Sequence, residues 1–373
     1  MIENIKSSTD LSGFYIIFYG SCNLERPGNY GISHLMEHLV CKSFDHLQDE
    51  LDENGISWNA YTSGNEIVFY WTGLEENLVK YRSNFLGLIS EFKITEEEFQ
   101  NEKNIVIQEY FDAFNDQSES HYLNLCRKEF DHYGPIGLLE DLKSLTLKDC
   151  QDYFKLQYSE PSKLINVSSE EMKGFKDKHF KDFSKFTSDP FAYDVKKNDD
   201  VKLEKMNQYD GKRSILIFSE PVVDPSHIAP VQMIAQMLSS GLNSPLYQEI
   251  REKRGLVYFI QNWIDRTGSI GRNFIASLTT EENVEKFKEA LYEVLDDPKK
   301  HLTEKRFNVI KNKLLISYKK NNINLHSNVN KYIAPKEWVL ENRIESITLK
   351  ECMDVYDMYF KSDKLKFTTD KEY

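Results

Sequence analysis

The chain has 373 residues, of which 40% are hydrophobic, and it contains 23 Phe and 21 Tyr. This is enough apolar material for two or more globular domains, because single cores rarely grow past about 250 residues. The formal net charge of -13 argues against nucleic acid as the main partner, since phosphate binding requires clustered Lys and Arg.

The N-terminal residues and the cysteines do not indicate export. The N-terminal residues, MIENIKSSTD, are polar and contain no apolar stretch of a secretory signal, and no run approaches the roughly 18 apolar residues of a membrane span. The cysteines are widely spaced and form no CxxC pair; they are Cys22, Cys41, Cys126, Cys150 and Cys352. This pattern is typical of reduced thiols, so we expect a cytoplasmic protein without a membrane partner.

The first half of the chain predicts alternating strands and helices. Thr95 and Glu98 have the spacing of a capping box, in which each residue satisfies a backbone N–H of the other at a helix start. The predicted elements, in chain order, are a buried strand over 13–20, a helix from Gly31 through HLMEHLV, a helix over 47–54 that ends at Gly55, a hairpin around 63–65, and helices over 75–92 and 96–114.

The middle of the chain predicts a domain boundary. Residues 185–211 are charged and polar and contain Pro, Asp and Gly, which are typical of a linker. We therefore expect a first unit over 1–184, a linker with the first strand of the second unit over 185–211, and a second unit over 212–373.

The two halves resemble each other. SLTLKDCQD at 144–152 recurs as SITLKECMD at 346–354, and ITEEEFQNEKNIVIQEY at 94–110 corresponds to LTEKRFNVIKNKLLISY at 302–318. Similar helix starts can arise independently, because S/T-x-x-[DE] caps are common. Two segments that recur in the same order at nearly the same offset favour a duplicated α/β unit of roughly 180 residues.

The stretch HLMEH could form a metal site on the predicted helix. His34 and His38 are four residues apart and share one helix face, where both imidazoles can reach one ion. Glu37 lies on an adjacent flank and could reach a water on that ion. Catalytic zinc normally takes three protein ligands, so a third must come from elsewhere. The alternative is a surface helix with solvated histidines.

The helix over 96–114 could supply the third ligand. Glu102 and Glu109 are seven residues apart, two helical turns, and share a face. One could bind the metal while the other orients a ligand, or both could be solvated acidic residues. In the second half Ile310 and Ser317 correspond to this pair. A weaker alignment places Ile234, Met237 and Leu238 opposite His34, Glu37 and His38.

The order His-x-x-Glu-His, followed by an E-x6-E pair, resembles the inverted zinc endopeptidases, the family of pitrilysin, insulin-degrading enzyme and mitochondrial processing peptidase. The chain is similar to a two-unit, processing-peptidase-like member. The resemblance implies an α+β fold of two homologous units, each a mixed, mostly antiparallel sheet with helices packed on one face. It implies that His34, His38 and Glu109 bind Zn2+, that Glu37 is the general base, and that Glu102 supports a ligand.

Two further stretches carry the resemblance. NAYTSGNE at 59–66 is similar to the edge strand that receives substrate in this family, which implies that Asn59, Ala60 and Tyr61 bind the peptide. IREKRGLVY at 250–258 resembles the second-unit element that supplies an Arg and a Tyr. Here Arg251 would anchor a substrate carbonyl and Tyr258 would stabilise the oxyanion. Outside the family context, these two would be a salt-bridged helix end and a core tyrosine.

The resemblance implies a zinc metalloendopeptidase that hydrolyses unfolded peptides or flexible protein segments in a closed chamber. The chamber normally contains four homologous units, so this chain would form a homodimer or a heterodimer with a related subunit. Three alternatives remain: a non-catalytic assembly subunit, a catalytic half that needs an inactive partner, and a metal-binding module without hydrolysis.

Overall fold

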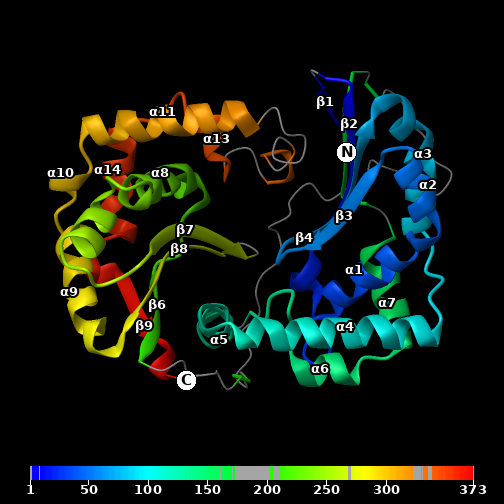
Figure 1. Ribbon diagram of the computed structural model, residues 1–373, viewed down its shortest axis with the longest axis horizontal. Helices are drawn as coiled ribbons and strands as arrows, with labels where there is room; N and C mark the ends of the chain where they lie inside the picture. The colour runs from blue at the N-terminus through cyan, green and yellow to red at the C-terminus, as the bar shows by residue number, and fades with distance from the viewer. Residues whose placement is uncertain are drawn as a thin grey trace. The chain divides into compact units, whose positions relative to one another are not determined.

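The computed structural model divides into two compact units, and most of their elements are labelled in Figure 1. Unit 1 contains most of the first half of the chain, and unit 2 contains most of the second half. The structure describes residues 2–7, 9–130, 132–159, 161–169, 171–172, 202–204, 211–267, 270–321, 329, 331–334 and 338–372.

Unit 1 is built on a five-stranded sheet with the order β1-β5-β2-β4-β3, in which β1 and β5 are parallel and the other pairs are antiparallel. Its strands are β1 (Ile2–Lys6), β2 (Leu11–Tyr19), β3 (Ser57–Thr62), β4 (Glu66–Leu74) and β5 (Lys163–Ser168). Its helices are α1 (Ile32–Lys42), α2 (Gln48–Glu53), α3 (Glu75–Ile89), α4 (Glu96–Asn115), α6 (Leu139–Ser144) and α7 (Leu147–Gln157). Strand β3 is therefore an edge strand.

The elements predicted for the first half are confirmed, with ends that shift by a few residues. Strand β2 is buried along nearly its whole length, as its continuous apolar sequence predicts. The capping box forms as expected: the Thr95 N–H donates to Glu98 Oε2 at 2.8 Å, and the Glu98 N–H donates to Thr95 Oγ1 at 3.2 Å. Gly55 follows α2 with a positive φ of 64°, a conformation that glycine adopts without strain.

Unit 2 contains a four-stranded antiparallel sheet with the order β7-β8-β6-β9. Its strands are β6 (Lys212–Ser219), β7 (Ile260–Thr267), β8 (Ile270–Thr280) and β9 (Leu365–Thr369). Its helices are α5 (Gln117–Phe130), α8 (Ile228–Ser239), α9 (Val284–Leu295), α10 (Pro298–His301), α11 (Glu304–Asn321), α13 (Leu340–Arg343) and α14 (Leu349–Tyr359). The strand order matches β3-β4-β2-β5 of unit 1, so the predicted duplication is confirmed.

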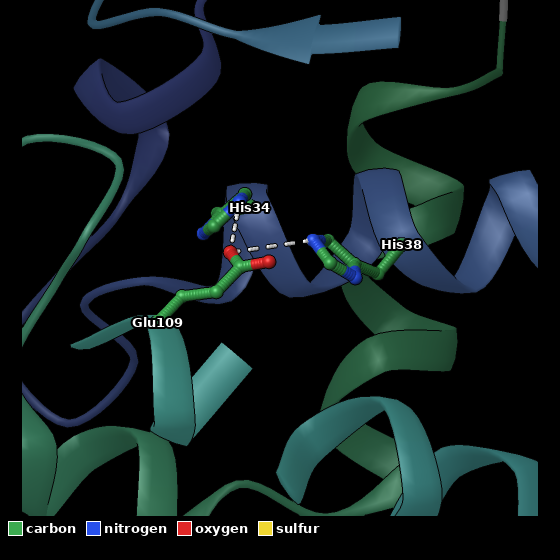
Figure 2. Close-up of side chains that lie close together, drawn as sticks. All are labelled: His34, His38 and Glu109. Carbon is green, nitrogen blue, oxygen red and sulfur yellow. Dashed lines mark ion pairs between the residues drawn. The ribbon is translucent and has the colours of Figure 1, made fainter. Parts of the chain in front are cut away.

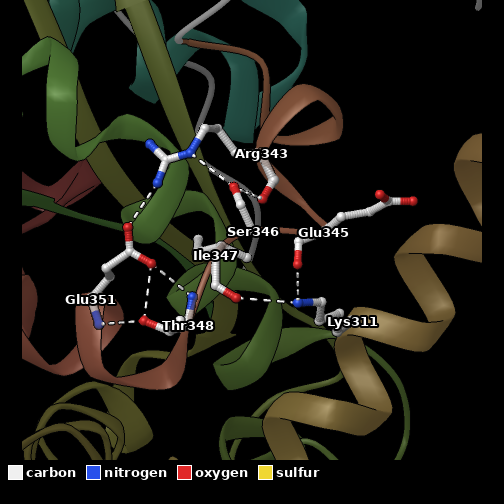
Figure 3. A network of polar contacts seen from close by, with 7 residues as sticks. All are labelled: Lys311, Arg343, Glu345, Ser346, Ile347, Thr348 and Glu351. Atoms are coloured by element: carbon white, nitrogen blue, oxygen red, sulfur yellow. Dashed lines mark hydrogen bonds and ion pairs between the residues drawn. The ribbon is translucent and has the colours of Figure 1, made fainter.

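One polar contact is repeated in the two copies. Lys103 on α4 donates to the carbonyl oxygens of Lys143 and Leu145 at 2.7 and 2.8 Å. In the second copy Lys311 on α11 donates to the corresponding carbonyls of Glu345 and Ile347 at 2.8 and 3.2 Å (Figure 3). In both copies, the lysine therefore connects the long helix (α4 or α11) by hydrogen bonds to the turn that precedes the next helix (α7 or α14).

That next helix, α7 in unit 1 and α14 in unit 2, also begins in the same way in both copies. Thr146 and Asp149 form a capping box at α7, and Thr348 and Glu351 form one at α14. Figure 3 shows the second of these boxes, in which Arg343 also contacts the Glu351 carboxylate at 2.7 Å. The repeated sequence therefore corresponds to a repeated structural element.

Each sheet is covered partly by residues from the opposite half of the sequence. Helix α5 belongs to unit 2, where Leu125 packs against Leu216, Phe218 and Phe274. Conversely, Val329 and Ile333 belong to unit 1 and pack in one core cluster with residues of its sheet. The linear boundaries at 184 and 212 stay a prediction, because α5 and the residues Val329 and Ile333 group with the sheet that they cover and not with their own half of the sequence.

The predicted fold class is confirmed, with one addition for unit 2. Leu216 and Phe218 point toward α5, whereas Ile215 and Ile217 point to the opposite face and are also fully buried. Both faces of this sheet are therefore covered. Among the residues that the structure describes, no helix combines the length and apolar character that crossing a bilayer would require.

Candidate metal site

Helix α1 begins at a backbone turn that is stabilised by a buried carboxylate. Gly31 occupies the N-cap with φ 95°, and the Glu25 carboxylate accepts the N–H groups of Gly31 and Ser33, both at 2.9 Å. These N–H groups have no partner inside the helix, so Glu25 fixes where the helix starts. This residue was not predicted from the sequence, because no short motif connects it to the helix.

One side of α1 anchors the helix in the core, and the histidines on the other side are only partly exposed. Leu35, Met36 and Leu39 are fully buried, whereas the side chains of His34 and His38 are 17% and 19% exposed. Their rings are 4.9 Å apart between centroids. The predicted i, i+4 arrangement therefore presents both imidazoles on one accessible side.

Figure 2 shows that Glu109 of α4 reaches both histidines. Glu109 Oε2 lies 3.4 Å from His34 Nε2 and 3.7 Å from His38 Nε2. The three ligand atoms all lie within 4.8 Å of one another, and no other such group of three is found in the described part of the chain. The structure thus brings together the three residues that the sequence analysis assigned to the metal.

The spacing of these atoms fits a zinc ion. Zinc binds histidine nitrogen and carboxylate oxygen at about 2.0–2.2 Å in tetrahedral geometry, which separates neighbouring ligand atoms by roughly 3.3–3.6 Å. The two Glu109 distances, 3.4 and 3.7 Å, lie close to this range. Two nitrogens and one oxygen are also a donor set that is typical of catalytic zinc.

The surroundings of the histidines favour metal binding. Burial, assisted by the neighbouring His38, lowers the pKa of His34 to about 4, so this imidazole is neutral at pH 7 and its nitrogen lone pair is available. Glu102 Oε2 lies 3.4 Å from His38 Nδ1, the nitrogen that does not face Glu109. A carboxylate in this position orients the ring and selects the tautomer that binds metal through Nε2.

Glu37 lies on the neighbouring flank of α1, where its side chain is largely buried. Burial raises the pKa of the Glu37 carboxyl, and the charge of Glu109 acts in the same direction, whereas Thr62 and His38 lower it. The Thr62 hydroxyl donates to Glu37 Oε2 at 2.6 Å. Thr62 lies in the NAYTSGNE stretch, but no role was predicted for it from the sequence.

Strand β3 presents an open main-chain edge next to this residue. Asn59, Ala60 and Tyr61 lie within β3, which pairs on one side with β4. The Ala60 N–H does not bond to β4 but to Asn59 Oδ1 at 2.8 Å. Because successive residues of a strand direct their main-chain groups to opposite sides, Trp58 and Thr62 share the outward direction of Ala60.

Arg251 and Tyr258 lie in unit 2 and contact each other there. The Arg251 guanidinium carbon is 4.5 Å from the ring centroid of Tyr247 and 4.9 Å from that of Tyr258. Tyr258 is 78% exposed, so the alternative of a core tyrosine is wrong. Arg251 Nε also lies 3.8 Å from Glu252 Oε1. An exposed phenol beside a guanidinium could donate to an anionic oxygen.

The corresponding helix of unit 2 has an apolar surface instead of ligands. Ile234, Met237 and Leu238 on α8 are fully buried, and Ile310 on α11 is 1% exposed. These residues pack the interior of unit 2, whereas their predicted counterparts in unit 1 are polar. Within the described residues, a group of three possible metal ligands is therefore found in only one of the two copies.

Comparisons with known proteins also distinguish the two halves of the chain. Residues 8–132 match the family model described as Insulinase (Peptidase family M16), and residues 146–314 match the model described as Peptidase M16 inactive domain. An uncharacterized zinc protease of Rickettsia felis is 22% identical over 343 residues, which cover 84% of this chain and 81% of that protein. A probable mitochondrial-processing peptidase subunit beta of Arabidopsis thaliana is 24% identical over 200 residues, covering 50% of this chain and 37% of that protein.

The fold is also shared with solved structures. The crystal structure of a protease from Helicobacter pylori superimposes with a TM-score of 0.79 at 17% identity, and the match covers 99% of this chain and 96% of that chain. The similarity therefore extends over both units, and not only over the helix that carries the histidines.

Proposed function

The chain belongs to peptidase family M16, and on that premise we propose that it is a zinc metalloendopeptidase acting on unfolded peptides or flexible protein segments. The observation that carries the proposal is the convergence of His34, His38 and Glu109 beside the buried carboxylate of Glu37. A site that only stored metal would have no use for this additional carboxylate.

The ligands would be His34 Nε2, His38 Nε2 and a Glu109 carboxylate oxygen. A zinc ion held there supplies Lewis acidity, which lowers the pKa of a bound water to about 7 and polarises the scissile carbonyl. Glu37 accepts a proton as the water oxygen bonds to the carbonyl carbon, and it returns this proton to the amine nitrogen as the C–N bond breaks. Its raised pKa suits a group that must both accept and release a proton near neutral pH.

We also propose catalytic roles for Tyr258 and Arg251, which belong to unit 2. The Tyr258 hydroxyl would donate to the oxyanion that develops on the scissile carbonyl, and Arg251 would bind a neighbouring substrate carbonyl. Their mutual contact supports a shared role, because the guanidinium restricts where the phenol ring can lie.

Substrate recognition would use the open edge of β3. An extended peptide can add to a sheet edge through main-chain hydrogen bonds, with little dependence on its side chains. Asn59, Ala60 and Tyr61 would line this peptide. Asn59 Oδ1, which accepts the Ala60 N–H, would have to release that group when a peptide binds.

We further propose that the chain works as a dimer, with itself or with a related subunit, and encloses the substrate in a chamber. Support comes from a relative whose name describes it as a subunit of a processing peptidase. A second candidate function, an assembly subunit of such a complex, is favoured by the match of residues 146–314 to an inactive domain. The complete ligand set in unit 1 argues for the catalytic function.

The deciding experiment combines metal analysis with digestion of a peptide library. We expect one zinc per chain, peptide cleavage, and loss of cleavage with 1,10-phenanthroline. Glu37→Gln should keep the metal and reduce cleavage on the order of 100-fold or more. The matched control is Glu97→Gln on the exposed first turn of α4, which should cleave normally. Cleavage by Glu37→Gln at the wild-type rate would show that the assigned base is wrong.

A separate measurement tests the chamber. Light scattering on the purified active protein should give a mass above that of one chain. A monomeric chain with full activity would contradict the dimer proposal but leave the zinc chemistry intact.

A further inference from the structure

The side chain of Thr62 holds the proposed general base. Its hydroxyl donates to Glu37 Oε2 at 2.6 Å, a short distance that is typical of a hydrogen bond to a carboxylate. Because Glu37 Oε2 already accepts this hydrogen bond, we assign the acceptance of the water proton to Glu37 Oε1. Loss of the hydroxyl would let the carboxylate rotate between these two roles.

The main chain of the same residue lies on the open edge of β3. Ser63 pairs with β4, because its N–H donates to the Glu66 carbonyl at 2.8 Å. The Ala60 N–H bonds instead to Asn59 Oδ1. In an antiparallel pair these directions alternate along the strand, so the main-chain groups of Thr62 point away from β4, as those of Ala60 do. A peptide that adds to β3 would meet them directly.

We propose that Thr62 is a positioning residue that couples peptide binding on the β3 edge to the orientation of the Glu37 carboxylate. A peptide that pairs with the main chain of Thr62 fixes the end of β3, and the hydroxyl on that same residue then fixes the base relative to the bound carbonyl. This inference rests on the proposed function and adds a role that neither the ligands nor Glu37 can supply.

The coupling predicts a particular kinetic signature. Removing the hydroxyl leaves the main-chain hydrogen bonds of β3 in place, so peptide affinity should change little. Chemistry should slow, because a hydrogen bond to a charged group is lost from the base. We expect kcat of Thr62→Val to fall on the order of 10- to 100-fold with KM within about threefold.

The test compares three variants that retain β-strand propensity or the hydroxyl. Thr62→Val removes the hydroxyl without changing the shape of the side chain, Thr62→Ser keeps the hydroxyl and should recover most of kcat, and Thr72→Val makes the same change on β4, outside the site. Zinc content is measured for each variant, and Thr62→Ala replaces Thr62→Val if that variant does not bind the metal.

A double variant separates positioning from general damage. If Thr62 acts through Glu37, then adding Thr62→Val to the Glu37→Gln variant should not lower kcat further, because the carboxylate that Thr62 positions is already lost. Wild-type kcat in Thr62→Val, or a change in KM alone, would overturn the inference but not the proposed function. A zinc-loaded wild-type chain that cleaves no peptide, or full activity in Glu37→Gln, would overturn both.

Discussion

Removal of the Glu102 carboxylate should weaken zinc binding without removing a ligand. Glu102 Oε2 lies 3.4 Å from His38 Nδ1, and its side chain is only 13% exposed. The other ring nitrogen of His38 faces Glu109. Glu102→Gln keeps an acceptor for the Nδ1 proton but loses the negative charge, whereas Glu102→Ala loses both.

The magnitude follows from what each variant removes. Loss of an outer carboxylate partner of a zinc-bound histidine typically costs 10- to 100-fold in metal affinity, which corresponds to about 1.4–2.7 kcal/mol of binding free energy. We expect this full loss for Glu102→Ala. For Glu102→Gln we expect a smaller loss, about three- to tenfold, because the hydrogen bond to the ring survives.

The assay is competition for zinc with a chromophoric chelator at fixed pH and ionic strength. Glu97→Gln, on the same helix and exposed, controls for the change of net charge. The expected order of affinity is wild type and Glu97→Gln first, then Glu102→Gln, then Glu102→Ala. If Glu102→Ala bound zinc within twofold of the wild type, the contact with His38 would have no role in metal binding.

Two further outcomes concern stability. Lys311→Met removes the charged donor to two carbonyls, so the free energy of unfolding, measured in urea, should fall by about 1–3 kcal/mol. The control, Lys319→Met at an exposed position of the same helix, should change it by less than about 0.5 kcal/mol. Equal effects of the two variants would refute the role of the Lys311 contact. Burial lowers the pKa of His121 to about 4. Between pH 6.5 and 4 this residue therefore binds a proton in the unfolded chain but not in the folded chain. The free energy of unfolding should consequently fall by about 2 kcal/mol from pH 7 to pH 5. His121→Gln should reduce that fall, and an unchanged slope in urea titrations would contradict the assignment.

The features that the sequence predicted correctly are local in the chain. Thr95 and Glu98 are three residues apart, and so are Thr348 and Glu351; in both pairs the contact depends only on that spacing and on the helix that follows. The duplication was also predictable, because the capping pair Thr146 and Asp149 recurs as Thr348 and Glu351, and the two repeated segments keep their order. The two family models confirm the resemblance that the HLMEH stretch and the glutamate pair indicated.

The features that the sequence did not reveal depend on contacts between distant elements. Glu25 accepts the N–H groups of Gly31 and Ser33 at the start of α1, and the loop between Glu25 and the helix has no pattern that predicts this contact. Thr62 reaches Glu37 only because β3 packs beside α1. The position of α5 was equally hidden. Its amphipathic pattern shows that one face is buried, but no local property of a helix determines which of two sheets it covers.

The exchange of covering segments also has a consequence for synthesis on the ribosome. Strand β5 completes the sheet of unit 1 at Ser168, but the cluster that contains Ile17, Val68 and Val167 is closed by Val329 and Ile333. At 5–20 residues per second, translation of the intervening chain takes roughly 10 to 30 s. During that interval one apolar face of the sheet lacks part of its cover, so we expect the nascent chain to offer a binding surface to chaperones before unit 1 is complete around α1.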